Sequence, residues 1–336
     1  MNWMKKMRRM KMKNNIDFKR ILKLSQKGLF NQLLLSFKGH EGSFLKDKYI
    51  LVKGDAPVML VAHLDTVHKE TVKTICSSEN GNILMSPQGI GGDDRCGVYA
   101  LLKAYSTSDV RPWLLFTCDE EIGCIGASAF AKNVNDSKYK QELEQLHFII
   151  EIDRKGKDDS VYYECDNHDF EKFVNNYGFK TNFGSVSDIS YVAPALGVAA
   201  VNLSSGYYNA HTQHEYIVLS EIEDTISKVV RMVNESPASP RFEYIEASYG
   251  KRSNWYGYDP KDIDTVYEEF YNETFWSLTL EQQQKFDDIL DYNYVDEDEL
   301  INYINDYGAE VVDDIFNEMN EIINNESSPK EGNASK

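Results

Sequence analysis

Acidic and imidazole side chains come directly after several short apolar runs of this 336-residue sequence. The run VMLVA precedes His63 and Asp65, and the run WLLFTC precedes Asp119, Glu120 and Glu121. Adjacent glutamates on a strand point to opposite faces, so both cannot be solvated on one surface. Three further segments also contain acidic or imidazole side chains: GGDDRCG with Asp93 and Asp94, FIIEID with Asp153, and AHTQHEY with His211 and His214.

These residue types suit divalent metal chemistry. Imidazole nitrogen and carboxylate oxygen are zinc ligands, and the number of candidates is enough for more than one ion. Two ions about 3.5–4 Å apart need a bridging carboxylate, and a further carboxylate beside the water, not bound to metal, can act as a general base. Adjacent glutamates on a turning chain would provide one ligand and one base. Asp65 fits an orienting role, as acceptor for the second ring nitrogen of His63.

Short apolar segments alternate with helical ones through most of the chain, which is typical of an α/β fold with a mainly parallel twisted sheet and helices on both faces. Open sheets of this kind place ligand sites at the carboxyl ends of their strands, where the polar clusters stand. Around the turn Gly-Asp-Ala-Pro, the strands YILV and VMLVA predict a hairpin. Helices are expected at 16–37, 97–105, GASAFAKNV, DFEKFVNNYG and SEIEDTISKVVRMVNE, the last capped by Ser220.

Charge and cysteine content narrow the classes of function. The net charge is −18, and 24 acidic against 7 basic residues from Arg241 onward leave only −1 for residues 1–240. Nucleic acid is therefore not an expected partner. The five cysteines form no CxxC motif, which indicates reduced thiols and a cytoplasmic protein. No apolar run approaches the roughly 20 residues that span a bilayer, so no membrane association is expected.

Composition also predicts the division of the chain. The acidic C-terminal part has enough aromatic residues for a small helical core, with helices at about 261–275, 279–291 and 296–323, and it is a candidate surface for a protein partner. The expected parts are a disordered basic arm (1–15), a catalytic domain (16–236), a linker (237–260), an acidic helical module (261–323) and a disordered tail (324–336).

Together the motifs resemble those of the co-catalytic di-zinc exopeptidase superfamily, which includes bacterial aminopeptidases, tripeptidase T, and related acylases and carboxypeptidases. HLDTV is similar to its His-x-Asp motif, GGDDRCGV to its bridging-aspartate loop, DEEIGCIGA to its Glu-Glu motif and AHTQHEY to its last His motif. The resemblance covers about residues 50–235, and the spacings of 30, 27–28, 32 and 58 residues also match.

The resemblance implies two divalent ions; zinc is expected, with cobalt and manganese as alternatives. Asp93 would bridge them, chosen over Asp94 because the family loop has the pattern Gly-x-Asp-x-Lys/Arg. That loop often holds a cis peptide bond after its bridging aspartate, so we expect one between Asp93 and Asp94. The remaining roles would fall to His63 and Asp153 at one ion, Glu121 and His211 at the other, and Glu120 as general base.

Two departures from the family pattern concern the substrate. Only 57 residues separate Asp153 from His211, too few for the lid domain of roughly a hundred residues found in acylase-like members. SVSDISY resembles a segment of single-domain aminopeptidases, but Gly184 stands where some of them have a tyrosine that steadies the tetrahedral intermediate. The oxyanion donor is open among Tyr191, Tyr207 and Tyr208, the candidates for substrate contact are Asp188, Tyr208 and Arg95, and His214 is expected outside the ligand set.

The predicted function is a zinc-dependent hydrolase of short peptides, in first place an aminopeptidase, in which Glu120 activates the bridging water. A deacylase of N-acyl amino acids, or a carboxypeptidase, is the alternative within enzymes. It would need a clamp for the substrate carboxylate, and no lid is present to supply one. A metal-binding protein without activity is the alternative outside enzymes, although the full set of ligands and base argues against it.

Overall fold

The computed structural model describes residues 17–184 and 186–247, separate positions between 278 and 304, and residues 308–327. Contacts divide the chain into two units, Met1–Ala247 and Ser248–Lys336. The expected arm at 1–15 and the expected helix at 261–275 lie outside the described residues. Among the described residues, no helix has the length and apolarity that crossing a membrane requires.

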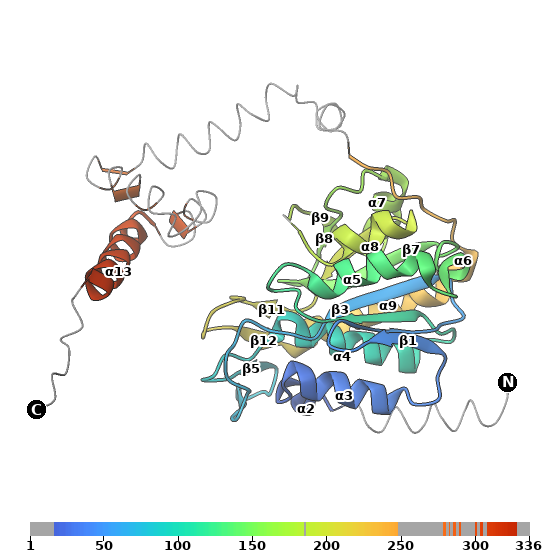
Figure 1. The fold of residues 1–336 in the computed structure, drawn as a ribbon, viewed down its shortest axis with the longest axis horizontal. Coiled ribbons are helices and arrows are strands. Elements are labelled where there is room, and N and C mark those ends of the chain that lie inside the picture. Colours follow the sequence, from blue (N-terminus) through green and yellow to red (C-terminus); the bar gives the residue numbers. More distant parts are fainter. Residues whose placement is uncertain are drawn as a thin grey trace, which may run out of the picture. The chain divides into compact units, whose positions relative to one another are not determined.

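An eight-stranded sheet forms the centre of the first unit (Figure 1). Its four middle strands, β6, β3, β7 and β10, run parallel, while β2 is antiparallel to β6 and β8 is antiparallel to β10. The predicted mainly parallel α/β fold is confirmed. In spatial order the strands are β1 (Gly42–Leu45), β2 (Tyr49–Val52), β6 (Trp113–Thr117), β3 (Val58–His63), β7 (Phe148–Arg154), β10 (Ala200–Ser204), β8 (Asp159–Val161) and β9 (Lys180–Thr181).

Both faces of this sheet are apolar, because alternate residues of each middle strand enter different cores. In β3, Leu60 and Ala62 belong to one core, and Met59 and Val61 belong to the other. The apolar faces are covered by helices on both sides (Figure 1). The first core includes residues of α2 (Phe18–Leu22), α3 (Gln26–Ser36), α4 (Gly92–Thr107), α7 (His168–Asn175) and α9 (Leu219–Glu235); the second includes α5 (Ile125–Asn133), α6 (Lys140–Leu143) and α8 (Ile189–Leu196).

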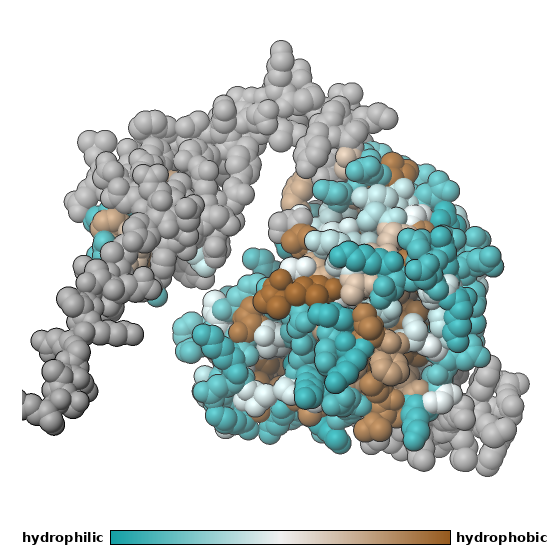
Figure 2. All heavy atoms as spheres, viewed as in Figure 1, coloured by the Kyte–Doolittle hydropathy of each residue, from teal (hydrophilic) through white to brown (hydrophobic). Residues whose placement is uncertain are grey.

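Hydrophilic residues cover much of the first unit on the side seen in Figure 2, with apolar patches between them.

A second, four-stranded antiparallel sheet adjoins α4, which contacts its strand β11. The loop between β11 and β12 carries His211, so this small sheet presents one of the predicted ligands. Its strands, in spatial order, are β11 (Tyr207–Tyr208), β12 (Tyr216–Val218), β5 (Ile83–Met85) and β4 (Cys76–Ser77).

Three local predictions are wrong. The expected hairpin is absent, because β6 lies between β2 and β3 and pairs with both. The expected helix at 16–37 is two helices, since the hydroxyl of Ser25 accepts a hydrogen bond from the N–H of Gly28 and begins α3 anew. Ser220 does not cap α9, which follows Val218.

The end of the first unit packs against its own core, and the second unit has a separate apolar core. Phe242, in the expected linker, is buried in the first core, and its N–H donates to the carbonyl of His147. In the second unit, helix α13 spans Glu310–Ser327. The helix expected at 296–323 is interrupted at Gly308, which has a φ of +88°. The described apolar core of this unit contains Leu278, Phe286, Ile289, Leu300, Ile304, Val312 and Met319.

Candidate metal centre

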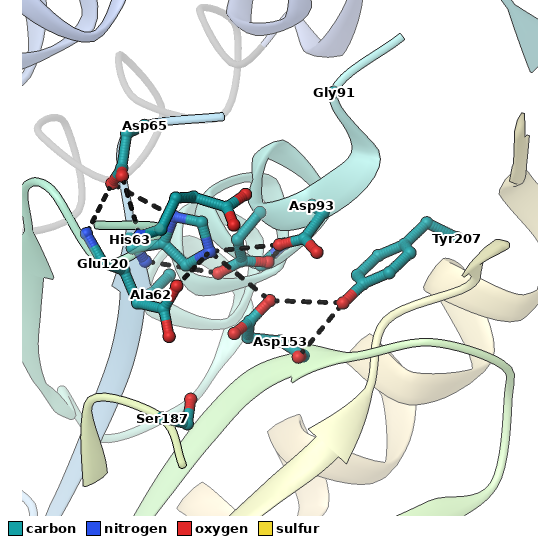
Figure 3. Close-up of polar contacts among 12 residues, drawn as sticks. Ala62, His63, Asp65, Gly91, Asp93, Glu120, Asp153, Ser187 and Tyr207 are labelled. Carbon is teal, nitrogen blue, oxygen red and sulfur yellow. Dashed lines mark hydrogen bonds and ion pairs between the residues drawn. The ribbon is translucent and has the colours of Figure 1, made fainter. Parts of the chain in front are cut away.

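The predicted metal ligands and general base meet at the carboxyl end of the large sheet. His63 is the last residue of β3, and Asp153 is the penultimate residue of β7. Glu120 and Glu121 follow β6, Asp93 lies at the start of α4, and His211 lies on the loop between β11 and β12. Figure 3 shows His63, Asp93, Asp153 and Glu120 with their side chains directed toward one another.

One edge of the His63 ring faces carboxylates. Its Nε2 lies 3.1 Å from Oδ1 of Asp93, 3.6 Å from Oδ1 of Asp153 and 3.9 Å from Oε2 of Glu120. The His63 side chain has no solvent exposure. A nitrogen and several oxygens thus converge from separate elements on one buried point.

The second oxygen of Asp93 faces a different imidazole. Nε2 of His211 lies 3.3 Å from Oδ2 of Asp93 and 3.0 Å from Oε2 of Glu121. The two oxygens of Asp93 are therefore directed to His63 on one side and to His211 on the other. A carboxylate that bridges two cations needs this arrangement.

Asp65 links the two loops of the site. Its Oδ1 lies 3.3 Å from Nδ1 of His63, on the ring edge away from Asp93. Its two oxygens also accept hydrogen bonds from the backbone N–H groups of Glu120 at 3.1 Å and Glu121 at 3.0 Å. Asp65 therefore orients the imidazole and fixes the backbone of both glutamates.

Glu215 holds the Asp93 loop, and sequence reasoning missed it. Its buried carboxylate accepts hydrogen bonds from the N–H of Gly91 at 2.8 Å and the N–H of Asp93 at 2.9 Å, and contacts Nε2 of His68 at 2.8 Å. The only sequence signal is an acid four residues after His211. The bond between Asp93 and Asp94 is cis, as predicted.

The structure also separates the roles of Asp93 and Asp94. One ligand atom from each of His63, Asp94 and Asp153 lies within 4.8 Å of the others, and the same holds for His63, Asp93 and Glu121. Asp94, however, already accepts the N–H of His63 at 3.3 Å and the N–H of Gly97 at 2.8 Å. Its oxygens are engaged by the backbone, whereas those of Asp93 face imidazoles.

The crowded carboxylates perturb one another. Burial, followed by the charge of Asp93, raises the pKa of Asp153 well above its usual value, and burial raises the pKa of Glu120. Hydrogen bonds to Asp93 and Glu121 raise the pKa of His211 to about 10. The cluster therefore favours positive charge at its centre. Nitrogen and oxygen donors arranged in this way fit divalent cations.

The three candidates for substrate contact are each buried or bonded to a neighbouring side chain. Asp188 is fully buried, its carboxylate accepts the hydroxyl of Thr117, and burial raises its pKa to about 7. The hydroxyl of Tyr208 donates to Oε2 of Glu221 at 2.7 Å. Arg95 is 4% exposed and lines a cavity on the Asp65 side of the site, and burial lowers its pKa to about 10.

Two of the three tyrosines that are candidates for the oxyanion donor are already engaged. The hydroxyl of Tyr207 lies 3.2 Å from the carbonyl and 3.4 Å from Oδ1 of Asp153, and Tyr208 donates to Glu221. Tyr191, on α8, is 39% exposed. His214 is exposed, and its N–H donates to the hydroxyl of Thr212.

Gly184 is closely surrounded by other side chains. A Cβ atom there would lie 3.1 Å from ring carbon Cε1 of Tyr163 and 3.1 Å from Cγ1 of Val161. Any side chain at this position would therefore require both neighbours to shift by a few tenths of an ångström.

Comparison with known proteins relates part of the chain to a family of peptidases. The model of peptidase family M28 matches residues 49–214, a stretch that contains every predicted site residue. The domain belongs to the co-catalytic zinc exopeptidase superfamily. The predicted enzyme class, a metallo-exopeptidase, is confirmed. The protein is a zinc-dependent peptide hydrolase with divalent metal cofactors. No curated protein matches the sequence.

Several solved structures are similar to this zinc exopeptidase. Aminopeptidase PepT from Bacillus cereus is 12% identical with a TM-score of 0.52, over 68% of this chain and 99% of that one. A tripeptidase from Staphylococcus aureus is 14% identical with a TM-score of 0.49, over 69% and 99%. TET1 peptidase from Pyrococcus horikoshii is 14% identical with a TM-score of 0.46, over 62% and 94%. At these identities the likeness to PepT shows a shared fold.

Proposed function

We propose that this zinc exopeptidase is an aminopeptidase that cleaves short peptides in the cytoplasm with two divalent ions, zinc in the first place. The observation that carries the proposal is the position of Asp93, whose two oxygens face Nε2 of His63 at 3.1 Å and Nε2 of His211 at 3.3 Å. All five cysteines are free, which supports a reducing compartment.

The residues that would hold the ions follow from this geometry. Asp93 would bridge, with His63 and Asp153 on one side and with Glu121 and His211 on the other. When bound, the ions polarise the scissile carbonyl and lower the pKa of the attacking water. Asp65 keeps Nε2 of His63 directed to the centre by contacting Nδ1.

Glu120 is the proposed general base. Its Oε2 lies 3.9 Å from Nε2 of His63, so it borders the ligand cluster from the loop after β6. Its raised pKa suits a group that takes a proton and later returns it. Glu120 would accept a proton from the attacking water and deliver it to the leaving amine.

The choice of aminopeptidase over deacylase or carboxypeptidase rests on the topology and the comparisons. The segment from Asp153 to His211 is used by strands β8, β9, β10 and β11 and helices α7 and α8, which leaves no residues for an inserted lid. The PepT structure of the same fold is described as an aminopeptidase. A catalytically silent metal-binding protein that holds a partner through its acidic C-terminal unit remains an outcome of the test.

The test compares Glu120→Gln with Glu79→Gln, a control at an exposed glutamate. Elemental analysis should find two metal ions per chain in both variants. Hydrolysis of aminoacyl-nitroanilides should fall by about 10²–10⁴-fold in Glu120→Gln, the usual contribution of a general base, and stay unchanged in Glu79→Gln.

Three results would reject parts of the proposal. Wild-type turnover in Glu120→Gln would exclude this residue as the base. Faster cleavage of N-acyl amino acids than of aminoacyl-nitroanilides would assign the deacylase reaction instead. Two bound ions with no hydrolysis of either substrate by the wild-type chain would favour the metal-binding role.

A further inference from the structure

A cavity of about 250 Å³ borders Asp65. Its wall is formed by the end of α2 and the start of α3, by the loop that follows β3, and by the loop that precedes α4 together with Arg95 on α4 itself. Among the predicted site residues, only Asp65 and Arg95 line it; the five proposed ligands and Glu120 do not. Its volume exceeds that of several water molecules, at about 30 Å³ each. The cavity is thus adjacent to the metal centre but separate from it.

Arg95 is a buried cation in the wall of the cavity. Its side chain is 4% exposed, and its Nε and Nη1 atoms are buried with no hydrogen-bond acceptor among the described residues. The charges of Asp65 and Asp94 act on it, but within the described part of the chain neither forms an ion pair with it. A buried guanidinium with unmet donors is costly. This cost indicates that a ligand with acceptor atoms completes the site.

The rest of the wall favours an anion. Lys69 lines the cavity, and so does Ser25, the residue that begins helix α3 and thus marks its partially positive end. The two acids of the wall are engaged elsewhere: Asp65 with His63 and two backbone N–H groups, and Glu70 with Lys73. Arg95, Lys69 and the helix end therefore remain to meet a negative group.

We propose that this cavity binds a free amino acid through its carboxylate, with Arg95 as the anchor. The proposal rests on the proposed function, because each peptide hydrolysis releases amino acids that carry a carboxylate. A planar carboxylate matches the fork of donors on a guanidinium. Asp65 lies in the same wall; its oxygens already accept two backbone N–H groups, and its negative charge also attracts the ammonium group. Because Asp65 also contacts His63 and the backbone of Glu120, an amino acid bound here would touch the support of the metal centre.

The experiment measures binding of alanine, acetate and inorganic phosphate to the full chain by calorimetry, in metal-free and zinc-loaded protein. Alanine should bind the metal-free protein with one site per chain, because the cavity includes none of the proposed metal ligands. Arg95→Met should weaken this binding at least tenfold, and Lys69→Glu, at an exposed position of the wall, should weaken it severalfold. Lys27→Glu is the control: it makes the same charge change on α3 outside the wall and should change the affinity less than twofold.

Each other outcome overturns the proposal. Alanine binding that requires zinc would place the amino acid at the metals. Preference for phosphate over alanine and acetate would assign a phosphate site, and no binding of any probe would show a water-filled cavity. Unchanged affinity in Lys69→Glu would also reject it, even if Arg95→Met fails to fold. The readout is binding without metal, so it stands whether or not Glu120→Gln loses turnover.

Discussion

The N–H of Asp93 donates a 2.9 Å hydrogen bond to Oε1 of Glu215, a buried residue 122 positions further along the chain. The second oxygen of Glu215 accepts the N–H of Gly91 at 2.8 Å. One carboxylate thus sets the backbone on both sides of Gly92. In this way the loop between β11 and β12, which carries Glu215 and His211, also fixes the loop that presents Asp93.

Glu215→Gln should therefore weaken metal binding. The amide has one acceptor oxygen, so one of the two backbone N–H groups would face an NH₂ group and lose its partner. A loss of about 10–100-fold in metal affinity is expected, as for other residues that support ligands. Competition with a chelator measures it, and Glu79→Gln, an exposed change of the same type, is the control. Equal affinities in the two variants would contradict this role of Glu215.

Asp65→Asn should lower activity even when metal is saturating. The variant keeps the shape of the side chain, but an NH₂ group would replace one of the oxygens that accept the N–H groups of Glu120 and Glu121. We expect a decrease of about 10–100-fold in kcat/KM. Asp136→Asn, at an exposed position, should retain wild-type kinetics. Full activity of Asp65→Asn at high zinc would show that the link from Asp65 to the two glutamates is dispensable.

Metal affinity should rise with pH. In the metal-free protein the pKa of His211 is raised to about 10 by hydrogen bonds to Asp93 and Glu121, so its imidazole is protonated at neutral pH. An ion must displace that proton, and each displaced proton makes the affinity increase about tenfold per pH unit below this pKa. Metal dissociation constants at pH 6, 7 and 8 test this. An affinity that does not change over this range would show that no proton leaves on binding.

Ile122 should contribute to the preference for the substrate side chain. It follows Glu121 directly, and 72% of its surface is exposed, so it presents an apolar side chain next to the proposed base and ligand. Ile122→Ser should raise KM severalfold for leucyl-nitroanilide and less for alanyl-nitroanilide, since less apolar surface would be buried. Leu35→Ser, on α3 and 73% exposed, is the matched control. Equal changes for both substrates would exclude Ile122 from side-chain recognition.

The parts of this site that could be predicted from the sequence are those with a local sequence signal. Contacts between residues far apart along the chain could not be predicted. The shared position of His63, Asp153 and the Glu120–Glu121 pair could be predicted because they lie at or just after the ends of apolar strands, and parallel strands end at one edge. The prediction of a hairpin was wrong because β2 pairs with β6, a strand more than sixty residues further along the chain. No local sequence pattern shows such a pairing. Glu215 was missed because its role lies in two backbone hydrogen bonds across the fold.

The same limit applies to small residues whose neighbours are distant in sequence. A Cβ atom on Gly97 would lie 2.2 Å from the carbonyl oxygen of Ile152 and 2.4 Å from both carboxylate oxygens of Asp94. Gly97→Ala should therefore move α4 away from β7 and reduce the free energy of unfolding by about 1–3 kcal/mol, the usual cost of overpacking. Gly28→Ala, inside α3, has its nearest contacts at 3.3 and 3.4 Å, and alanine is favoured over glycine in helices by about 1 kcal/mol. Denaturant unfolding of the metal-free chain should give opposite signs for the two variants, and a Gly97→Ala protein as stable as the wild type would refute the tight contact between α4 and β7.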